Sequence, residues 1–166
     1  FKTAGIDMQP YPQWDEASEK FQVADAADLP FEDSSFDTVV SFETLEHVPD
    51  PEAVLREFHR VCRKNIIVSV PNCELPSSLE ASRLTFFHYT DRSHVNFFTR
   101  NSLTEALLKT GFAPLDMALI NACPTQPLLN ELFRLPASLT HLLGKLARKD
   151  AFQMTILVVA TKGELA

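Results

Sequence analysis

Short apolar and β-branched runs alternate along the chain with helical or turn-rich segments. The runs occupy residues 3–6, 21–24, 36–42, 65–70, 115–121 and 154–161. Short runs bounded by turn-forming residues are typical of β-strands. Residues 38–42 and 66–70 are nearly continuously apolar or β-branched, which indicates parallel strands covered on both faces. The pattern therefore predicts an α/β fold built on a largely parallel sheet.

Two helices are marked by their ends as well as by their apolar faces. Asp50 is a suitable N-cap, and Pro51 a suitable first residue, for a helix that leads to the run at 65–70. The apolar face of this helix consists of Val54, Leu55, Phe58, Val61 and Cys62. Thr99 caps a second helix that ends at Gly111. The inward residues of the second helix are Leu103, Ala106 and Leu107.

Residues 71–98 form a connection too long for a simple turn between a strand and a helix. The segment is rich in Pro, Ser and aromatic residues, and a loop of this length in a compact domain usually serves a binding site. We therefore expect it to contribute to ligand recognition. The side chains that could do so are Tyr89, Asp91, Arg92 and Asn96.

Residues 124–149 carry apolar positions at helical spacing, interrupted by Pro136 and Gly144. We expect one or two amphipathic helices that pack on the domain's own core or on a second subunit. Two functional alternatives are a cap over the binding site and peripheral contact with a membrane surface. The basic residues available for membrane contact are Arg134, Lys145, Arg148 and Lys149.

The composition, with 166 residues of which 45% are hydrophobic, fits a single domain with its own core. No window approaches the roughly 20 apolar residues of a membrane-spanning helix. Residues 1–60 carry 14 acidic and 4 basic side chains, whereas residues 61–166 carry 8 acidic and 11 basic side chains. This distribution argues against nucleic acid as a partner, because binding to a phosphate backbone requires a concentrated basic surface. It does not reveal the oligomeric state.

Cys62, Cys73 and Cys123 form an odd set, without a CxxC spacing or a histidine at ligand distance in the sequence. We therefore expect reduced thiols, a cytoplasmic location and no metal ion.

Acidic or polar residues stand at the ends of three predicted strands. Asp7 follows the first run, and Asp25 follows the second. Ser41 and Glu43 stand at the end of the third run. Ligands of open α/β sheets bind at the carboxyl ends of the strands, where a carboxylate can accept hydrogen bonds from both hydroxyls of a ribose. The alternative for each acid is a cap on the turn that follows its strand.

Residues 25–72 read DAADLPFEDSSFDTVVSFETLEHVPDPEAVLREFHRVCRKNIIVSVPN. Several features follow one another in this stretch, and their succession is far more specific than a single short motif. They are an acidic strand end, LPF, an acidic turn, FDTVVS, LEHV, a helix start at Asp50 and Pro51, EFHRV and a strand ending in VPN. This stretch resembles the class I S-adenosylmethionine-dependent methyltransferases, particularly the type 11 small-molecule group. Residues 94–112 resemble the segment that follows in that family, and the likeness covers most of residues 3–121.

The resemblance implies a Rossmann-like fold. Its sheet is mostly parallel, with the strand order 3-2-1-4-5-7-6, an antiparallel last strand and helices on both faces. The chain begins at what resembles the second strand, and none of its four Gly forms the glycine-rich turn that cradles the methionine end of the cofactor. We therefore expect residues 1–166 to be one partial domain with an upstream segment in the parent protein, and with a gap where the first strand belongs.

The resemblance also implies roles for individual residues. Asp7 corresponds to the acid that binds the ribose hydroxyls, and Met8 to a position that packs on the adenine ring. Asp25 corresponds to the acid that accepts from the adenine amino group, with the backbone of Ala26 at the ring edge. The pocket where the methionine part meets the methyl acceptor is lined by Ser41, Phe42 and Glu43, and the acceptor-site loop is 71–98.

Methyl transfer is an in-line displacement at a sulfonium carbon, so the positioning of donor and acceptor supplies most of the catalysis. An oxygen or nitrogen acceptor that loses a proton benefits from a general base. The imidazoles expected near the pocket are His47, His88 and His94. Of these, we take His47 and His94 as candidates for the base or for orienting the acceptor, and a structural role is the alternative for each.

The sequence thus predicts S-adenosylmethionine-dependent methyl transfer to an unidentified small-molecule acceptor, with S-adenosylhomocysteine as product. Two alternatives stay open, an inactive methyltransferase-like scaffold and a nucleotide-dependent oxidoreductase on a similar sheet. Asp7 and Asp25 argue against the scaffold, and the run from LPF to VPN argues against the oxidoreductase. The Phe-rich loop at 86–98 suggests an apolar or aromatic acceptor.

Overall fold

The computed structural model describes residues 2–16, 20–81, 87–123, 134, 136, 138, 139, 141–143 and 152–163. The strands are β1 (Ala4–Asp7), β2 (Lys20–Val23), β3 (Phe36–Phe42), β4 (Cys62–Pro71), β5 (Phe112–Ala122) and β6 (Gln153–Lys162). The helices are α1 (Pro51–Val61), α2 (Ser77–Ala81) and α3 (Arg100–Lys109), with short 3-10 turns η1 (Pro12–Glu16) and η2 (Phe87–Tyr89). All six predicted strands and both predicted helices are confirmed.

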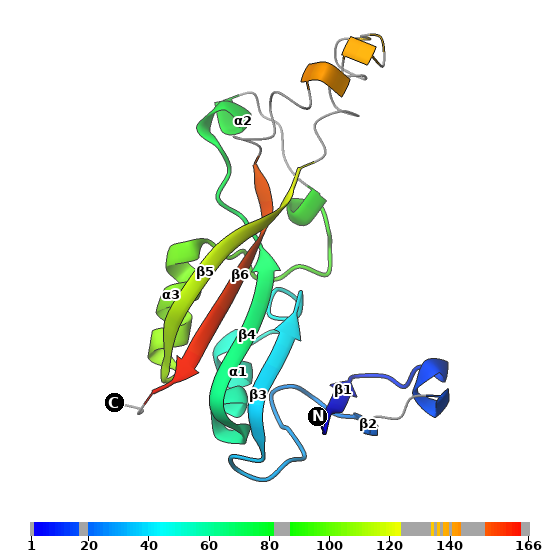
Figure 1. Ribbon diagram of the computed structural model, residues 1–166, viewed down its shortest axis with the longest axis vertical. Helices are drawn as coiled ribbons and strands as arrows, with labels where there is room; N and C mark the ends of the chain where they lie inside the picture. Colours follow the sequence, from blue (N-terminus) through cyan, green and yellow to red (C-terminus); the bar gives the residue numbers. More distant parts are fainter. Residues whose placement is uncertain are drawn as a thin grey trace.

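The strands form two sheets within the described part of the chain (Figure 1). β1 and β2 pair in parallel. The second sheet has the order β3-β4-β6-β5, in which β3 and β4 are parallel and β6 runs antiparallel to both of its neighbours. If β1 is counted as the family's second strand, this is the expected order, with the first position not filled by a described strand. The Rossmann-like class and the antiparallel last strand are confirmed.

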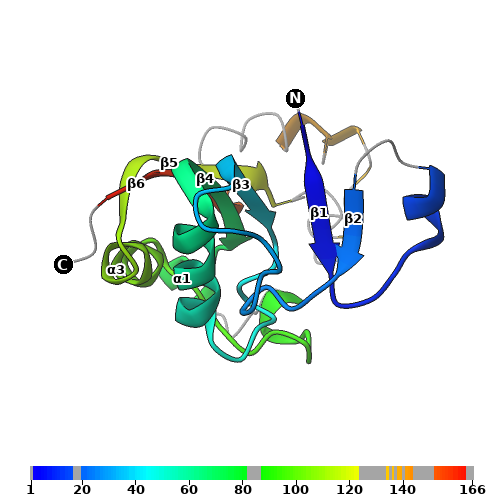
Figure 2. The same cartoon turned by 90° about the horizontal axis from the view of Figure 1, so that it is seen from below.

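α1 and α3 lie side by side on one face of the four-stranded sheet (Figure 2). Their inward side chains and those of β4 and β6 form the core between the sheet and the helix pair. The fully buried members of this core include Val54, Leu55, Ile66, Val68, Val70, Leu103, Leu107, Ile156 and Val158. Helices expected on the opposite face are not among the elements that the structure describes.

α1 begins as its sequence predicts. Oδ1 of Asp50 accepts a hydrogen bond from the backbone N of Ala53 at 2.9 Å, and Pro51 is the first helical residue. The helix ends at Val61, and Cys62 is both its C-cap and the first residue of β4. Cys62 therefore belongs to the strand rather than to the helical face, because the chain enters β4 without a connecting residue.

α3 is fixed at both ends by the predicted residues. The backbone N of Thr99 donates to Oγ of Ser102 at 2.9 Å, and the backbone N of Ser102 donates to Oγ1 of Thr99 at 3.1 Å. Gly111, which follows the helix, has φ 87°, in the left-handed region that favours glycine.

Most of the predicted insertion at 124–149 lies outside the described residues. Of the part that is described, Ser138, Leu139 and residues 141–143 are helical. None of the described helices is long and apolar enough to cross a membrane.

The guanidinium of Arg60, near the end of α1, binds the loop between β2 and β3. Nε and Nη2 donate to the carboxylate of Glu57 at 2.8 and 2.7 Å. Nη1 and Nη2 donate to the carbonyl oxygens of Phe31 and Leu29 at 2.7 and 2.8 Å, and Nη1 also donates to Asp33 at 2.9 Å. The carboxylate of Glu57 in turn accepts from the backbone N of Leu29 at 2.8 Å. These charge-assisted bonds fix the loop against α1.

Replacement of Arg60 by Met should lower the free energy of unfolding by roughly 2–4 kcal/mol, because Glu57 and two loop carbonyls lose charged donors. Arg56→Met is the matched control, since Arg56 lies on the same helix, is half-exposed and forms ion pairs of 3.8 and 3.5 Å with Asp50 and Glu52. The control should cost less than about 0.5 kcal/mol. Urea unfolding followed by circular dichroism measures the free energy of unfolding of both variants. Equal losses of stability in the two variants would contradict the stabilising role given to the hydrogen bonds of Arg60.

Candidate functional site

A cavity of about 410 Å³ separates β1 from β3. Among the described strands, β1 pairs only with β2 and β3 only with β4, so the edges that face each other are not paired. Figure 2 shows β1 and β2 beside β3, on the side away from β4. The walls comprise residues 2–6, β3 and apolar side chains that include Leu29, Phe31 and Phe58. The cavity lies where the resemblance leaves a gap in the sheet.

Asp7 and Asp25 stand together at the carboxyl edge of the β1–β2 sheet. The carbonyl oxygen of Asp7 accepts from the backbone N of Ala24, the neighbour of Asp25, at 3.0 Å. Oδ1 of Asp7 accepts from the backbone N of Gln9 at 3.2 Å, and Oδ1 of Asp25 from that of Ala27 at 2.8 Å. Each acid caps its turn with one oxygen, and no hydrogen bond within the described residues reaches its Oδ2. The turn-cap and ligand-binding hypotheses are therefore compatible.

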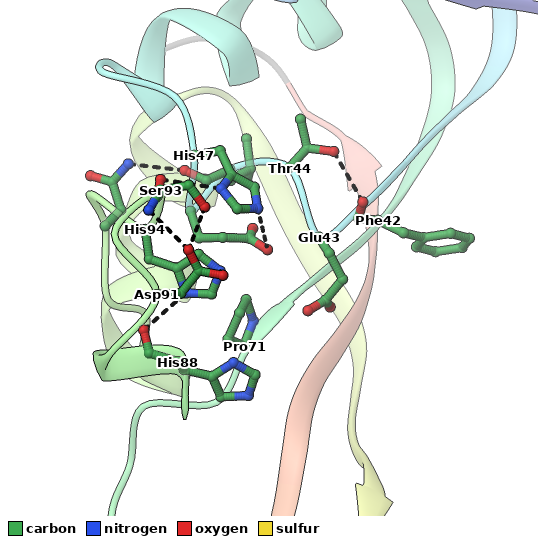
Figure 3. A network of polar contacts seen from close by, with 12 residues as sticks. Phe42, Glu43, Thr44, His47, Pro71, His88, Asp91, Ser93 and His94 are labelled. Atoms are coloured by element: carbon green, nitrogen blue, oxygen red, sulfur yellow. Dashed lines mark hydrogen bonds and ion pairs between the residues drawn. The ribbon is translucent and has the colours of Figure 1, made fainter. Parts of the chain in front are cut away.

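The residues that end β3 point in different directions. Ser41 is buried and Phe42 is 57% exposed, and both line the cavity. Glu43 has φ 48°, in the left-handed region, and its carboxylate accepts from Oγ of Ser69 on β4 at 2.7 Å. Figure 3 shows the side chains of Phe42 and Glu43 on opposite sides of the chain. The backbone turn thus directs Glu43 away from the cavity.

The structure brings together only some of the predicted cofactor residues. Ala26, Ser41 and Phe42 line the cavity. The predicted residues that do not line it are Asp7, Met8, Asp25 and Glu43. Met8 is 69% exposed and follows directly on Asp7, so its side chain is accessible to a ligand at the edge of the β1–β2 sheet.

His47 and His94, the two candidate bases, lie together although they come from distant parts of the chain (Figure 3). Their ring centroids are 4.7 Å apart, with the planes at 70°. Nδ1 of His47 donates to the carbonyl oxygen of Ser93 at 3.2 Å, and Nδ1 of His94 to that of His88 at 3.0 Å. A neutral imidazole that donates from Nδ1 has Nε2 as its acceptor. Both rings can therefore take a proton or a ligand at Nε2.

The two rings differ in their access to solvent. The side chain of His47 is 40% exposed and that of His94 is 6% exposed. His88 is buried beside them, with its ring stacked on His94 at a centroid distance of 5.8 Å. Burial lowers the pKa of His88, which favours its neutral form.

Glu46 lies beside these histidines, although its sequence context does not single it out. It is 1% exposed, and neither carboxylate oxygen has a hydrogen-bond partner among the described residues. Oε1 lies 3.7 Å from Nε2 of His47. Burial raises the pKa of Glu46 to about 7. The only sequence signal is an acid next to the buried Leu45 in LEHV, which cannot be distinguished from a solvated turn residue without the fold.

The neighbours of Glu46 are held by a clamp from the loop at 71–98. The backbone N atoms of Val95 and Asn96 donate to the carbonyl oxygen of Glu46 at 2.8 and 3.1 Å. Nδ2 of Asn96 donates to the carbonyl oxygens of Leu45 and Val48 at 2.9 and 2.7 Å. Asn96, a predicted recognition residue, therefore uses its amide nitrogen to join the loop to the turn after β3.

An exposed apolar surface lies on the same loop. Tyr89 stacks on Phe97 with a centroid distance of 5.2 Å, and its hydroxyl donates to the carbonyl oxygen of Cys73 at 2.6 Å. Phe97 is 47% exposed and Val95 57% exposed. These side chains give part of the loop at 71–98 an exposed apolar surface.

Residues 2–69 match the family model described as a methyltransferase domain. The chain is 35% identical over 91 residues to malonyl-[acyl-carrier protein] O-methyltransferase of Laribacter hongkongensis, a match that covers 54% of this chain and 30% of that enzyme. It is 56% identical over 41 residues to chloroplastic tocopherol O-methyltransferase of Arabidopsis thaliana. This match covers 25% of this chain and 12% of that enzyme. A methyltransferase structure from Archaeoglobus fulgidus aligns with a TM-score of 0.64 and 20% identity over 96% of this chain and 75% of that one.

The order of the described strands is the one expected of this fold class once its first position is left open. With the family match, it makes the chain similar to the class I S-adenosylmethionine-dependent methyltransferases over the residues compared. The cofactor of this family is S-adenosylmethionine, which becomes S-adenosylhomocysteine. The chain spans less than a third of the length of the two curated relatives named above.

Replacement of Glu46 by Gln should flatten the pH dependence of stability in buffer that contains EDTA. The folded protein holds the Glu46 proton up to a pKa of about 7, above the ordinary value of 4.5. The protonated carboxyl therefore contributes stability that is fully present below the unfolded pKa and is lost as the pH rises through the folded pKa. The loss is about 3 kcal/mol.

Urea titrations from about pH 5 to pH 8 measure this difference. The wild-type free energy of unfolding should fall relative to that of the variant across this window. The groups that face Glu46 are Glu43, His47 and His94, and they are the same in both proteins. Parallel pH profiles for the two proteins would show that Glu46 is ionised in the folded state throughout.

Proposed function

We propose that the protein transfers a methyl group from S-adenosylmethionine to a small-molecule acceptor by in-line displacement. The observation that carries the proposal is the position of Asp7 and Asp25 at one sheet edge, where β1 also forms a wall of the cavity. Carboxylates at the carboxyl ends of parallel strands suit a nucleoside, which offers a ribose diol and an adenine amino group.

The residue roles that we propose follow from this arrangement. Asp7 accepts hydrogen bonds from the ribose hydroxyls through Oδ2, and Met8 packs on the adenine ring. Asp25 accepts from the adenine amino group, with Ala26 at the ring edge. Ser41 and Phe42 line the space for the methionine part, and Glu43 holds the turn after β3 through Ser69.

We also propose that a strand and a glycine-rich turn upstream of residue 1 fill the cavity in the full-length protein, so that residues 1–166 are part of one domain. Two facing strand edges with unpaired backbone groups support this, because one further strand between them would satisfy both. In this proposal residues 71–98 are the acceptor-site loop and 124–149 a helical insertion between β5 and β6.

When bound at the edge that Asp7 and Asp25 form, the cofactor would supply an electrophilic methyl group on a sulfonium centre. The protein's task is to position the acceptor within about 3 to 3.5 Å of that carbon. His47 is the proposed base, because its ring is half-exposed and its Nε2 is an acceptor. His94, which is more buried, orients the acceptor or His47.

The class of acceptor is proposed from the exposed surface on the acceptor-site loop. The stacked pair of Tyr89 and Phe97, with Val95 beside Asn96, favours an apolar or aromatic molecule over a strongly anionic one. The names of the two relatives cover acceptors as different as a malonyl group on a carrier protein and tocopherol. They therefore support methyl transfer without selecting an acceptor.

An inactive scaffold is the second candidate function, since a fold does not guarantee activity. The unengaged Oδ2 atoms of Asp7 and Asp25 favour the enzyme. The family match favours methyl transfer over a nucleotide-dependent oxidoreductase. A cytoplasmic location is proposed with the enzyme, supported by the free thiols of Cys62, Cys73 and Cys123.

Calorimetric titration of S-adenosylhomocysteine into the full-length protein tests the proposal. Asp7→Ala should weaken binding roughly 10- to 100-fold, because a charged acceptor of two ribose hydrogen bonds is lost. Asp15→Ala is the matched control, since Asp15 is an exposed acid in η1 and should leave the affinity within about twofold.

Three outcomes would contradict the proposal in different ways. Failure of the full-length protein to bind S-adenosylhomocysteine would favour the scaffold. Binding of NAD in its place would favour the oxidoreductase. Equal affinities for the wild type and Asp7→Ala would reduce Asp7 to a turn cap and remove the observation on which the proposal rests.

A further inference from the structure

We propose that Glu46, His47 and His94 form a binding site for a divalent transition-metal ion, with zinc as the reference metal. None of the three residues lines the cavity between β1 and β3. The inference goes beyond methyl transfer and does not depend on it. With an ion bound, Nε2 of His47 is a ligand, so the role of His47 as a base belongs to the metal-free protein. No metal is expected from the sequence, because the cysteine spacings offer no ligand set, whereas these ligands come from two segments that only the fold brings together.

The three side chains already have the separations that a metal ion requires. One ligand atom of each, a carboxylate oxygen of Glu46 and a ring nitrogen of each histidine, lies within 4.8 Å of the other two. Oε1 of Glu46 and Nε2 of His47 are 3.7 Å apart. Ligands about 2.1 Å from a tetrahedral ion are about 3.4 Å from one another. Small side-chain rotations would therefore complete the coordination.

The hydrogen bonds of the two histidines prepare them as ligands. Nδ1 of His47 donates to the carbonyl oxygen of Ser93, and Nδ1 of His94 to that of His88. Histidines that bind metals commonly donate the other ring N–H to a backbone carbonyl or carboxylate, which fixes the tautomer and the ring plane. Both Nε2 atoms thus carry a lone pair and are held in place.

Glu46 supplies a second, independent observation. Its carboxylate is 1% exposed, and neither oxygen accepts a hydrogen bond from the part of the chain that the structure describes. A carboxylate buried in this way is costly unless a cation or donors compensate it. A dication between Glu46 and the two imidazoles would provide that compensation.

The fold fixes the two segments that carry the ligands. The backbone N atoms of Val95 and Asn96 donate to the carbonyl oxygen of Glu46, and the side chain of Asn96 donates to Leu45 and Val48. These bonds hold His94 against the turn that carries Glu46 and His47. A site whose ligands are braced by backbone hydrogen bonds loses little conformational entropy when a metal binds.

The ligand types select the class of metal. Two imidazoles and one carboxylate suit zinc, iron, cobalt or nickel better than magnesium or calcium, which prefer oxygen ligands throughout. Three protein ligands leave at least one coordination position for water or an exogenous oxygen or nitrogen. Figure 3 shows the two histidines near Glu43, at the end of β3. A bound ion would therefore lie at the carboxyl end of the sheet, where ligands of this fold class bind.

The alternative without metal is a proton network. Nε2 of His94 lies 3.8 Å from Oδ2 of Asp91. Burial of the Glu46 carboxyl group favours its protonated form. In that case the cluster would hold one or more protons where the metal would sit, and added zinc would compete poorly.

The test is calorimetric titration of zinc into the full-length protein, after treatment with EDTA and removal of the chelator. We expect one equivalent to bind. Glu46→Gln and His94→Gln should each weaken binding at least roughly 10- to 100-fold. His141→Gln is the matched control, because His141 is an exposed histidine outside the cluster and should leave the affinity unchanged.

Thermal unfolding separates loss of a ligand from loss of the fold. In EDTA at about pH 8, Glu46→Gln should be at least as stable as the wild type, because it removes a buried charge. Zinc should raise the melting temperature of the wild type and of His141→Gln but not that of Glu46→Gln. Cobalt in place of zinc should give the visible absorption of a site with nitrogen ligands in the wild type and in His141→Gln but not in Glu46→Gln.

Absence of stoichiometric zinc binding in the wild type would overturn the proposal, and so would equal affinities in the wild type, Glu46→Gln and His94→Gln. Titration of S-adenosylhomocysteine into the same EDTA-treated protein distinguishes this failure from failure of the proposed methyl transfer. Cofactor binding without zinc binding would refute the metal site alone, and zinc binding without cofactor binding would refute only the methyltransferase proposal.

Discussion

The guanidinium of Arg60 is the contact on which the arrangement of the site most depends. It ties the loop between β2 and β3 to α1 through carbonyl oxygens, Asp33 and the shared carboxylate of Glu57. This loop follows directly on Asp25 and leads into β3, so the same contact connects the two sheets through the chain. Since β1 and β3 are not paired with each other, the loop and the side-chain packing hold them on either side of the cavity.

The structure divides the chemistry of the chain between two places. The first is the edge of the β1–β2 sheet, where Asp7 and Asp25 offer carboxylate oxygens. The second is the turn after β3, where Glu46, His47 and His94 meet under the clamp made by Asn96. Ser41 and Phe42 lie between these places in the sequence and line the cavity. A donor held at the first place and an acceptor or metal at the second would be served by different residues, so substitutions could affect them separately.

Much of the fold could be predicted from the sequence because local signals specify it. Asp50 with Pro51, and Thr99 with Gly111, mark both helices, and β-branched runs mark every strand. The strand order needed the family resemblance, since pairing between distant strands leaves no local pattern. The convergence of Glu46 with His94 could not be predicted, because it depends on hydrogen bonds from Asn96 to backbone carbonyls. The role of Arg60 was equally hidden, although Glu57 and Arg60 belong to the quoted motif.

The direct passage from α1 into β4 has a consequence for how this fold can vary. Val61 is helical and Cys62 already extended, and β4 then pairs with β3 on one side and β6 on the other. Successive side chains of a strand face opposite ways, so one inserted residue at this junction would exchange the core and outer faces of the central strand. A change of length at this point therefore has to be absorbed within β4 itself, whose register against β3 already shifts between Phe36 and Thr38. Among proteins of this architecture, insertions should accumulate in the connections between elements rather than at the helix-to-strand joint.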